Sequence, residues 1–327
     1  MSNLDLILVM SSNNNTEPSE FILIGFPGLQ KEQKWLSIPF CILLLIAVFG
    51  NVTVIFIISK ENTLHKPMYI FISFLAVIDL VPTISLLPNL LLLVMFELKN
   101  ISFTMCFMQM FLIGFSATME SSMLLLMAYD RYIAVSNPLN YASLITNSFV
   151  CKWSLILCFR SLLFSLPLPI LARILSYCSY RTISNCYCSY TTVTKIACNN
   201  YIITTAYSFF LTFAVAAPDT ILIILSYYRI AKAAINLKSA DAMRKVLSTC
   251  SSHLFVILFF YATGILSVVV NLFEKSIPFY ISVLSSVLYI VIPPAINPVI
   301  YSVRTKEVRI ATIKHFKKIM KLPSGKY

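Results

Sequence analysis

Long apolar stretches alternate with short polar connectors along the chain, and this pattern predicts helices that cross a membrane. A helix needs about 20 mostly apolar residues to cross the hydrocarbon layer of a bilayer. Stretches of that length cover residues 36–59, 67–94, 103–128, 150–171, 201–228, 246–271 and 278–302. The pattern therefore predicts an all-α membrane protein built as a seven-transmembrane helix bundle.

The composition agrees with a membrane protein, since 58% of the 327 residues are hydrophobic and only 12% are charged. Soluble domains carry roughly 25% charged residues. We expect a single domain over 1–327, with an extracellular N-terminus at 1–35, the helix bundle at 36–302, and a cytoplasmic tail at 303–327 that forms a short amphipathic helix. The connectors leave no room for a separate catalytic domain, so we do not expect an enzyme.

The distribution of Lys and Arg predicts the orientation of the chain. With the N-terminus outside, most basic residues fall in the connectors and the tail on the inner side, as is typical of membrane proteins. The net charge of +12 is then directed at anionic lipid and protein on the cytoplasmic side rather than at nucleic acid. Glycosylation sequons begin at Asn14 and Asn100, in segments on the outer side. These signals predict a multi-pass protein of the plasma membrane with an extracellular N-terminus.

Several cysteines lie in segments expected outside the membrane, where an oxidising environment allows disulfides to persist. They are Cys106, Cys178, Cys186, Cys188 and Cys198. Their number is odd, so one stays free or pairs elsewhere, and the residues alone do not decide between Cys186 and Cys188. We expect no metal site for catalysis, because zinc ligands follow characteristic spacings and the histidines are scattered along the chain. They are His65, His253 and His315.

Few ionisable residues lie inside the apolar stretches, and their cost in lipid makes each of them a candidate for function. Asp79 in the second stretch and Glu120 in the third are placed to meet inside the bundle. There they would share a proton or a cation such as sodium and act as a conformational switch; a polar pair that only fixes helix packing is the equal alternative. Asp219 follows Pro218 in the fifth stretch, where the missing backbone donor bends the helix. We expect Asp219 to be structural.

The seventh stretch has the features of a pivot. Pro293, Pro294 and Pro298 interrupt its backbone hydrogen bonds. Asn297 supplies an amide that is expected to hydrogen bond to the freed backbone groups, and Tyr301 lies one turn further along.

The third stretch ends in a second candidate switch. Arg131 follows Asp130 directly. The carboxylate is expected to hold the arginine in one state and to release it in another. A static salt bridge is the alternative.

Six short motifs occur in order along nearly the whole chain. They are Gly50-Asn51, Leu64–Tyr69 (LHKPMY), Met127–Val135 (MAYDRYIAV), Ser226–Ile230 (SYYRI), Lys245–Leu254 (KVLSTCSSHL) and Pro294–Tyr301 (PAINPVIY). In this order they resemble the motifs of odorant receptors, members of the rhodopsin-like, seven-helix G-protein-coupled superfamily. Gly25–Leu29 (GFPGL) and Asp219 resemble the fish-like class I receptors more than the terrestrial class II.

The resemblance implies a pairing for the outer cysteines. Cys106, at the start of the third helix, would bond to Cys188 and fasten the second outer loop to the bundle. Cys178 would bond to Cys198 within that loop. Cys186 is then the extra cysteine.

The resemblance also implies the function of an odorant receptor. A small-molecule odorant binds in the outer half of the bundle and favours an open sixth helix. A heterotrimeric G protein of the stimulatory, olfactory type then binds at the inner end, in a cleft framed by Arg131, Tyr227 and Tyr301, and cyclic AMP rises. The residues implied in coupling and switching are Asp130, Arg131, Tyr132, Tyr227, Lys245, His253, Asn297, Pro298 and Tyr301. No cofactor is implied apart from a sodium ion near Asp79 and Glu120.

Helical phase and the geometry of the family give candidate ligand-binding residues. They are Ile113, Gly114, Ala117, Thr118, Ser208, Leu211, Thr212, Tyr261, Ile265, Val268 and Val287. Ordinary packing of the bundle is the alternative for each of them. Asn271 and Leu272 stand where some class I relatives have a basic residue, so a strongly acidic ligand is disfavoured.

Other classes of membrane protein fit the sequence less well. A transporter or channel would use the same intramembrane acids, but transport folds commonly contain an internal repeat, and the two halves of this chain show none. A peptide or hormone receptor would be favoured by a long acidic N-terminal segment, which Ser11 to Glu20 is not. A non-olfactory or orphan receptor of the same family stays open.

Overall fold

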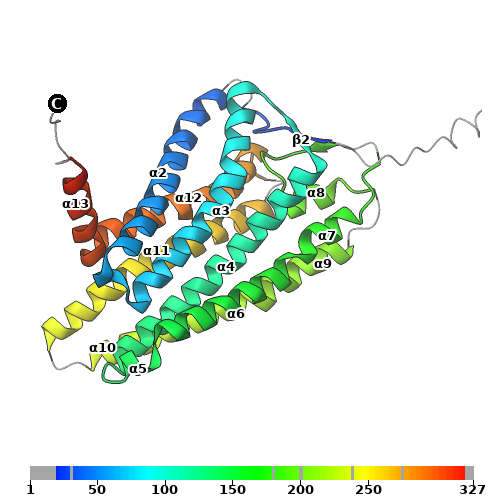
Figure 1. Ribbon diagram of the computed structural model, residues 1–327. Coiled ribbons are helices and arrows are strands. Elements are labelled where there is room, and N and C mark those ends of the chain that lie inside the picture. The colour runs from blue at the N-terminus through cyan, green and yellow to red at the C-terminus, as the bar shows by residue number, and fades with distance from the viewer. Residues whose placement is uncertain are drawn as a thin grey trace, which may run out of the picture.

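The computed structural model describes residues 20–29, 32–178, 181–198, 202–236, 239–273 and 276–320. In this part of the chain seven helical segments are long and apolar enough to cross a membrane, and they lie side by side as a bundle (Figure 1). The segments are α2 (Gln33–Lys60), α3 (Pro67–Phe96), α4 (Phe103–Ser136), α6 with α7 (Asn147–Ser165 and Pro167–Arg173), α9, η2 and α10 (Ile202–Leu211, Thr212–Ala216 and Ala217–Ile235), α11 (Ala240–Leu272) and α12 (Phe279–Arg304). The predicted seven-helix bundle is confirmed.

Short elements connect these helices. They are η1 (Asn62–Leu64), α5 (Tyr141–Leu144) and α8 (Tyr190–Lys195). Two of the long helices begin at side-chain caps, since the hydroxyls of Ser102 and Thr146 accept hydrogen bonds from the backbone N–H groups of Met105 and Phe149. The connectors are short, so consecutive helices run antiparallel.

A small sheet, which periodicity did not predict, covers one end of the bundle. Strand β1 (Glu20–Leu23) lies between β2 (Asn100–Ser102) and β3 (Thr182–Ile183), antiparallel to β2 and parallel to β3. Phe21 from β1 is fully buried, with its ring 5.4 Å from that of Phe103 and 5.3 Å from that of Tyr177. We call this the sheet end of the bundle and the opposite end, where α4 carries Arg131, the Arg131 end.

Helix α13 (Lys306–Met320) follows α12 and is the amphipathic C-terminal helix that we expected. It buries Val308 and Ala311 and turns charged side chains outward. Lys314 donates a 2.9 Å hydrogen bond to Glu61 at the end of α2. Figure 1 shows α13 lying across the Arg131 end of the bundle beside α2.

A side chain of α2 replaces one backbone hydrogen bond that is missing from α12. Pro298 has no N–H to donate to the carbonyl of Pro294, four residues earlier. Instead, the Asn51 side-chain amide donates a 2.8 Å hydrogen bond to that carbonyl and a second one to the carbonyl of Ala47. The expectation that Asn297 would fill this role is wrong, because its amide points to the acidic residues of α3 and α4.

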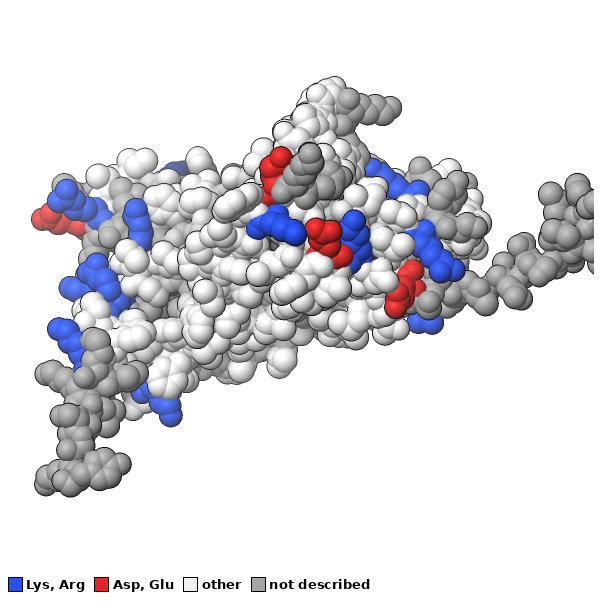
Figure 2. Space-filling view, turned by 90° about the horizontal axis from the view of Figure 1, so that it is seen from above, with Lys and Arg blue, Asp and Glu red and all other residues white. Residues whose placement is uncertain are grey.

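The surface agrees with a lipid environment. Many large apolar side chains are exposed, among them Phe49, Phe159, Phe213 and Ile224. Figure 2 shows the charged side chains of one face gathered in groups, with a broad uncharged stretch of surface between them. Exposed apolar surface of this extent marks membrane contact.

Candidate functional site

At the Arg131 end, Arg131 is held by its neighbour. Its Nε donates a 2.9 Å hydrogen bond to Oδ2 of Asp130, and the arginine is only 8% exposed. The phenol of Tyr141, on α5, donates a 2.7 Å bond to Oδ1 of the same carboxylate. Burial raises the pKa of the Tyr141 phenol, and the negative Asp130 raises it further, so this group remains a protonated donor. In this structure Arg131 is therefore held by the Asp130 carboxylate and is not released. We call this the closed arrangement.

Other residues that the sequence predicts to act in switching lie near Arg131. Tyr227 on α10 and His253 on α11 are joined by a 2.8 Å hydrogen bond between Oη and Nδ1. Tyr301 on α12 is buried, and its hydroxyl has no hydrogen-bond partner in the described part of the chain. A cavity lined in part by Arg131, His253 and Tyr301 has a volume of only about 10 Å³, which is roughly the space for one water molecule. The inner cleft is therefore closed in this structure.

The remaining predicted coupling residues are placed differently. Tyr132 does not face this cavity; it lines a groove on the outside of the bundle. Pro298 packs against Gly50, where an added Cβ would lie 2.8 Å from the proline ring. The side chain of Lys245 lies outside the described residues.

In the middle of the bundle the structure brings together the two acids singled out from the sequence. Asp79, Glu120 and Asn297 are all buried. The Asn297 amide donates to Asp79 Oδ2 at 3.0 Å and to Glu120 Oε1 at 3.4 Å. Asp79 Oδ1 and Asn297 Oδ1 are buried and have no hydrogen-bond partner among the described residues. Buried oxygens without a hydrogen-bond partner are unfavourable, and a proton or a ligand would satisfy them.

A second polar cluster joins α4, α6, α10 and α11, and its central ion pair between Arg160 and Asp219 was not predicted from the sequence. Arg160 on α6 donates to both carboxylate oxygens of Asp219, each at 2.9 Å. Ser121 donates a 2.9 Å bond to Asp219 and lies 3.1 Å from the hydroxyl of Tyr261. An arginine inside an apolar stretch is itself a signal, but its partner becomes visible only when the neighbouring helices are known.

At the sheet end, two disulfides hold the loop between α7 and α9. They join Cys106 to Cys188 and Cys178 to Cys198, the pairing that the resemblance implied. The backbone N–H of Cys188 also donates a 2.9 Å bond to the side chain of Gln109 on α4. Cys186 is free and buried, and burial raises the pKa of its thiol.

Some candidate ligand-binding residues point into the sheet half of the bundle. Val287 is fully buried, while Ile113 and Leu211 pack at the edge of the same apolar cluster. Tyr261 faces inward through its contact with Ser121. The other half-buried candidates are Ala117 and Ser208.

Other candidates face away from the interior, which corrects the predicted pocket. Thr118 hydrogen bonds to Ser165 at 3.0 Å, and a Cβ on Gly114 would lie 2.8 Å from Leu168. These two positions of α4 therefore serve packing against α6 and α7. Thr212 lies at the exposed start of the π-helical turn η2, where its hydroxyl bonds to the backbone of Ser208.

The predicted phase of α11 was also wrong. Ile265 is 62% exposed and Val268 is 60% exposed, so both lie on the outer face. Ser267 is buried and lies 3.4 Å from Ser286 on α12, and Asn271, exposed near the end of α11, accepts a 2.6 Å hydrogen bond from Ser282 on α12. Periodicity alone did not show this, because apolar residues cover the lipid face as well as the interior.

The two predicted glycosylation sites differ in what the structure shows. Asn100 is exposed on β2, and its amide donates a 2.9 Å hydrogen bond to Glu20. Asn14 lies outside the described residues.

Comparisons with known proteins agree with this architecture. The sequence model of the family described as "Olfactory receptor" matches residues 40–319. The chain is 41% identical over 299 residues to Olfactory receptor 56A1 of Homo sapiens, covering 91% of this chain and 94% of that receptor. It is 38% identical over 306 residues to Olfactory receptor 56B34 of Mus musculus, covering 94% and 95%. Squid rhodopsin has the same fold, with a TM-score of 0.70 at 18% identity over 91% of this chain and 89% of the rhodopsin chain.

Proposed function

The chain belongs to the olfactory receptor family, and on this premise we propose that it binds a small odorant near its sheet end and activates a stimulatory G protein at its Arg131 end. It is not an enzyme, and the seven apolar helices in the described part of the chain make it a multi-pass membrane protein. The proposal concerns where the ligand binds, which G protein responds and how the two ends are coupled.

The distribution of charge supports the orientation that we propose. We place the protein in the plasma membrane. In this orientation the sheet end lies outside the cell and the Arg131 end lies on the cytoplasmic side. The basic residues of the loops near Arg131 and of α13 then face the anionic inner leaflet. The two disulfides lie on the oxidising side.

The observation that carries the coupling proposal is that Arg131 is enclosed and held by Asp130. It is buried, bonded to Asp130 and bordered by almost no free volume. A G protein needs an open surface at this end, so activation has to separate α11 from α4 and break the hold on the arginine. An odorant achieves this only by binding the open state more tightly than the closed state.

Side chains that face inward at the sheet half of the bundle support the proposed ligand site. We place the odorant among Ile113, Leu211 and Val287, with Ser267 as the polar contact. These groups favour an uncharged molecule that carries a hydrogen-bonding group. Arg160 does not alter this preference, because its charge is already paired with Asp219.

The polar centre at Asp79 suits a sodium ion, which prefers oxygen ligands. Asp79 Oδ1 and Asn297 Oδ1 are buried without partners among the described residues, and the Glu120 carboxylate lies beside them. Two buried carboxylates repel each other unless a proton or a cation lies between them. We propose that these three residues hold the ion and that it stabilises the closed state. Thermal unfolding of the purified protein in sodium and in N-methylglucamine chloride tests this: sodium should raise Tm, and Asp79→Asn should remove the difference. An equal increase in the variant would contradict the proposed site.

The function is tested in cells that express the receptor with an olfactory-type stimulatory G protein. A panel of uncharged odorants is applied and cyclic AMP is measured, with cells lacking the receptor as the control. A receptor-dependent increase supports the proposal. A receptor-dependent ion current without cyclic AMP would overturn it.

A further inference from the structure

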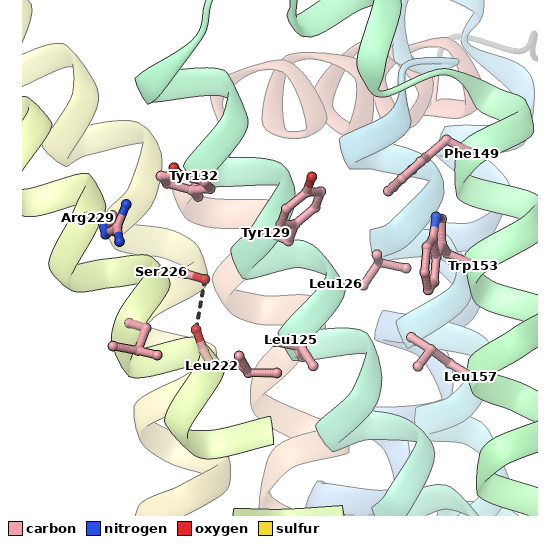
Figure 3. A pocket seen from close by; sticks show the side chains of 11 residues that line it. Leu125, Leu126, Tyr129, Tyr132, Phe149, Trp153, Leu157, Leu222, Ser226 and Arg229 are labelled. Atoms are coloured by element: carbon pink, nitrogen blue, oxygen red, sulfur yellow. Dashed lines mark hydrogen bonds between the residues drawn. The ribbon is translucent and has the colours of Figure 1, made fainter. Parts of the chain in front are cut away.

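An open groove runs along the outside of the bundle between α4, α6 and α10, close to the Arg131 end (Figure 3). Its volume is about 570 Å³, within the roughly 300–1,000 Å³ of ligand sites in proteins. It is separate from the proposed odorant site, which lies inside the bundle at the other end. None of the odorant or sodium contacts proposed above lines it.

The groove changes character along its length. On α4, Leu125 is followed toward the Arg131 end by Tyr129 and Tyr132. On α10, Leu222 is followed in the same direction by Arg229. Figure 3 shows the two leucines in the lower part of the groove and the two tyrosines and the arginine above them. One end is therefore aliphatic, and the other is aromatic and basic.

Aromatic side chains of α6 line the third wall of the groove, at the same end as the tyrosines of α4. Phe149 stacks on Tyr129 with ring centroids 6.2 Å apart, and Trp153 lies 5.9 Å from Phe149. Further from the Arg131 end, α6 contributes Leu157. Trp and Tyr gather where the hydrocarbon layer meets the headgroups, so the polar end of the groove lies at the headgroup level.

Arg229 brings an uncompensated charge to that end. It is exposed, and no acidic side chain pairs with it in the described part of the chain. The neighbouring Ser226 hydroxyl is directed to the backbone of its own helix, with a 2.8 Å bond to the carbonyl of Leu222 (Figure 3). The positive charge is therefore available to an anion that approaches from the membrane.

We propose that this groove binds an anionic phospholipid of the inner leaflet, with its negatively charged headgroup at Arg229 and one acyl chain along the leucines. Basic pockets between membrane helices on the cytoplasmic side suit anionic headgroups. A neutral sterol matches the aliphatic end but leaves the arginine without a counter-charge. The proposal rests on the orientation given under Proposed function. The lipid would contact α4 and α10, the helices that carry Arg131 and Tyr227. Lipid binding would therefore influence coupling to the G protein.

Native mass spectrometry of the purified receptor in detergent tests the headgroup contact. Phosphatidylserine and phosphatidylcholine with identical acyl chains are added at equal concentration. The expected result is a preference for phosphatidylserine that falls at least about fivefold in Arg229→Gln. Lys232→Gln is the matched control, because Lys232 is exposed on the same helix and does not line the groove. Equal binding of the two lipids, or equal losses in the two variants, would overturn the proposal.

A second pair of variants tests the acyl-chain contact. Leu222→Trp fills the aliphatic end and should reduce phosphatidylserine binding, whereas Ile224→Trp, outside the groove on the same exposed helix, should not. Unchanged binding in Leu222→Trp would show that the chain lies elsewhere and would overturn the proposal. Neither experiment needs odorant or G protein. Equal binding of the two lipids by the wild-type receptor, with a normal cyclic AMP response, counts against the groove alone. A phosphatidylserine preference in the wild-type receptor without a cyclic AMP response counts against the receptor function alone.

Discussion

The guanidinium of Arg160 lies 2.9 Å from the carboxylate of Asp219, and this ion pair joins α6 to α10 inside the apolar layer. The Asp219 side chain is only 1% exposed and that of Arg160 is 24% exposed. Two opposite charges in lipid stabilise a fold only as a pair, because each one alone carries a large desolvation cost. The pair explains why Asp219 is tolerated in the fifth membrane helix.

Neutralising one member of this pair should destabilise the receptor. We expect Arg160→Gln or Asp219→Asn to lower the free energy of unfolding by about 2–3 kcal/mol, somewhat less than the ~3–5 kcal/mol of fully buried pairs. Thermal unfolding in detergent and the fraction of receptor at the cell surface measure the effect. The double variant Arg160→Met with Asp219→Leu should be more stable than either single variant. A double variant no more stable than the single variants would show that the two charges do not act as a pair.

Removing the Tyr141 hydroxyl should raise signalling without odorant. Tyr141 donates a 2.7 Å hydrogen bond to Asp130, and Asp130 holds Arg131. Tyr141→Phe loses a contact of about 1 kcal/mol that stabilises the closed state, which corresponds to a roughly fivefold larger open population. Basal cyclic AMP at matched surface expression is the measurement. Tyr228→Phe, on the exposed face of α10, is the control, and equal basal signalling in the two variants would contradict the role of Tyr141.

Neighbouring residues of α11 distinguish the inner face from the lipid face. Ser267 is 8% exposed and Val268 is 60% exposed. For an agonist found in the odorant panel, Ser267→Leu should raise the half-maximal concentration about tenfold, or ~1.4 kcal/mol. Val268→Leu should leave it unchanged. The reverse order would restore the pocket first predicted from helical phase.

Cys186 should react slowly with alkylating reagents in the folded receptor. Burial raises the pKa of its thiol, and the thiolate is the reactive species. Near pH 8 the folded-state thiol is therefore protonated, and labelling should speed up as pH rises and more thiolate forms. An exposed cysteine in the same loop, Ser184→Cys on a Cys186→Ser background, should label much faster. Mass spectrometry of iodoacetamide adducts gives both rates, and equal rates would show that the loop does not bury Cys186.

The bundle was predictable because lipid imposes a simple rule of length and polarity on each spanning helix. The first span was predicted at 36–59 and forms 33–60, and the seventh was predicted at 278–302 and forms 279–304. The sheet was not predictable in the same way. Its strands have only two to four residues and pair segments far apart in the chain, so no period-2 pattern can develop.

The site was predictable where a motif fixes the chemistry and less so where neighbouring helices decide it. Asp79, Glu120 and Asn297 meet because each is polar in an apolar span and must find a partner. The partner of the Pro294 carbonyl was wrongly expected to be Asn297 and is Asn51, which lies on another helix. Ile265 was wrongly placed inside because the lipid face of α11 is as apolar as the bundle interior.

Above all, we propose that an odorant bound at the sheet end controls binding of the G protein at the Arg131 end. The most direct measurement compares wild-type receptor with Arg131→Ala at equal surface expression, recording cyclic AMP and, separately, binding of a labelled agonist. We expect the variant to bind the agonist as the wild type does and to produce no increase in cyclic AMP. A normal cyclic AMP response from Arg131→Ala would contradict the account.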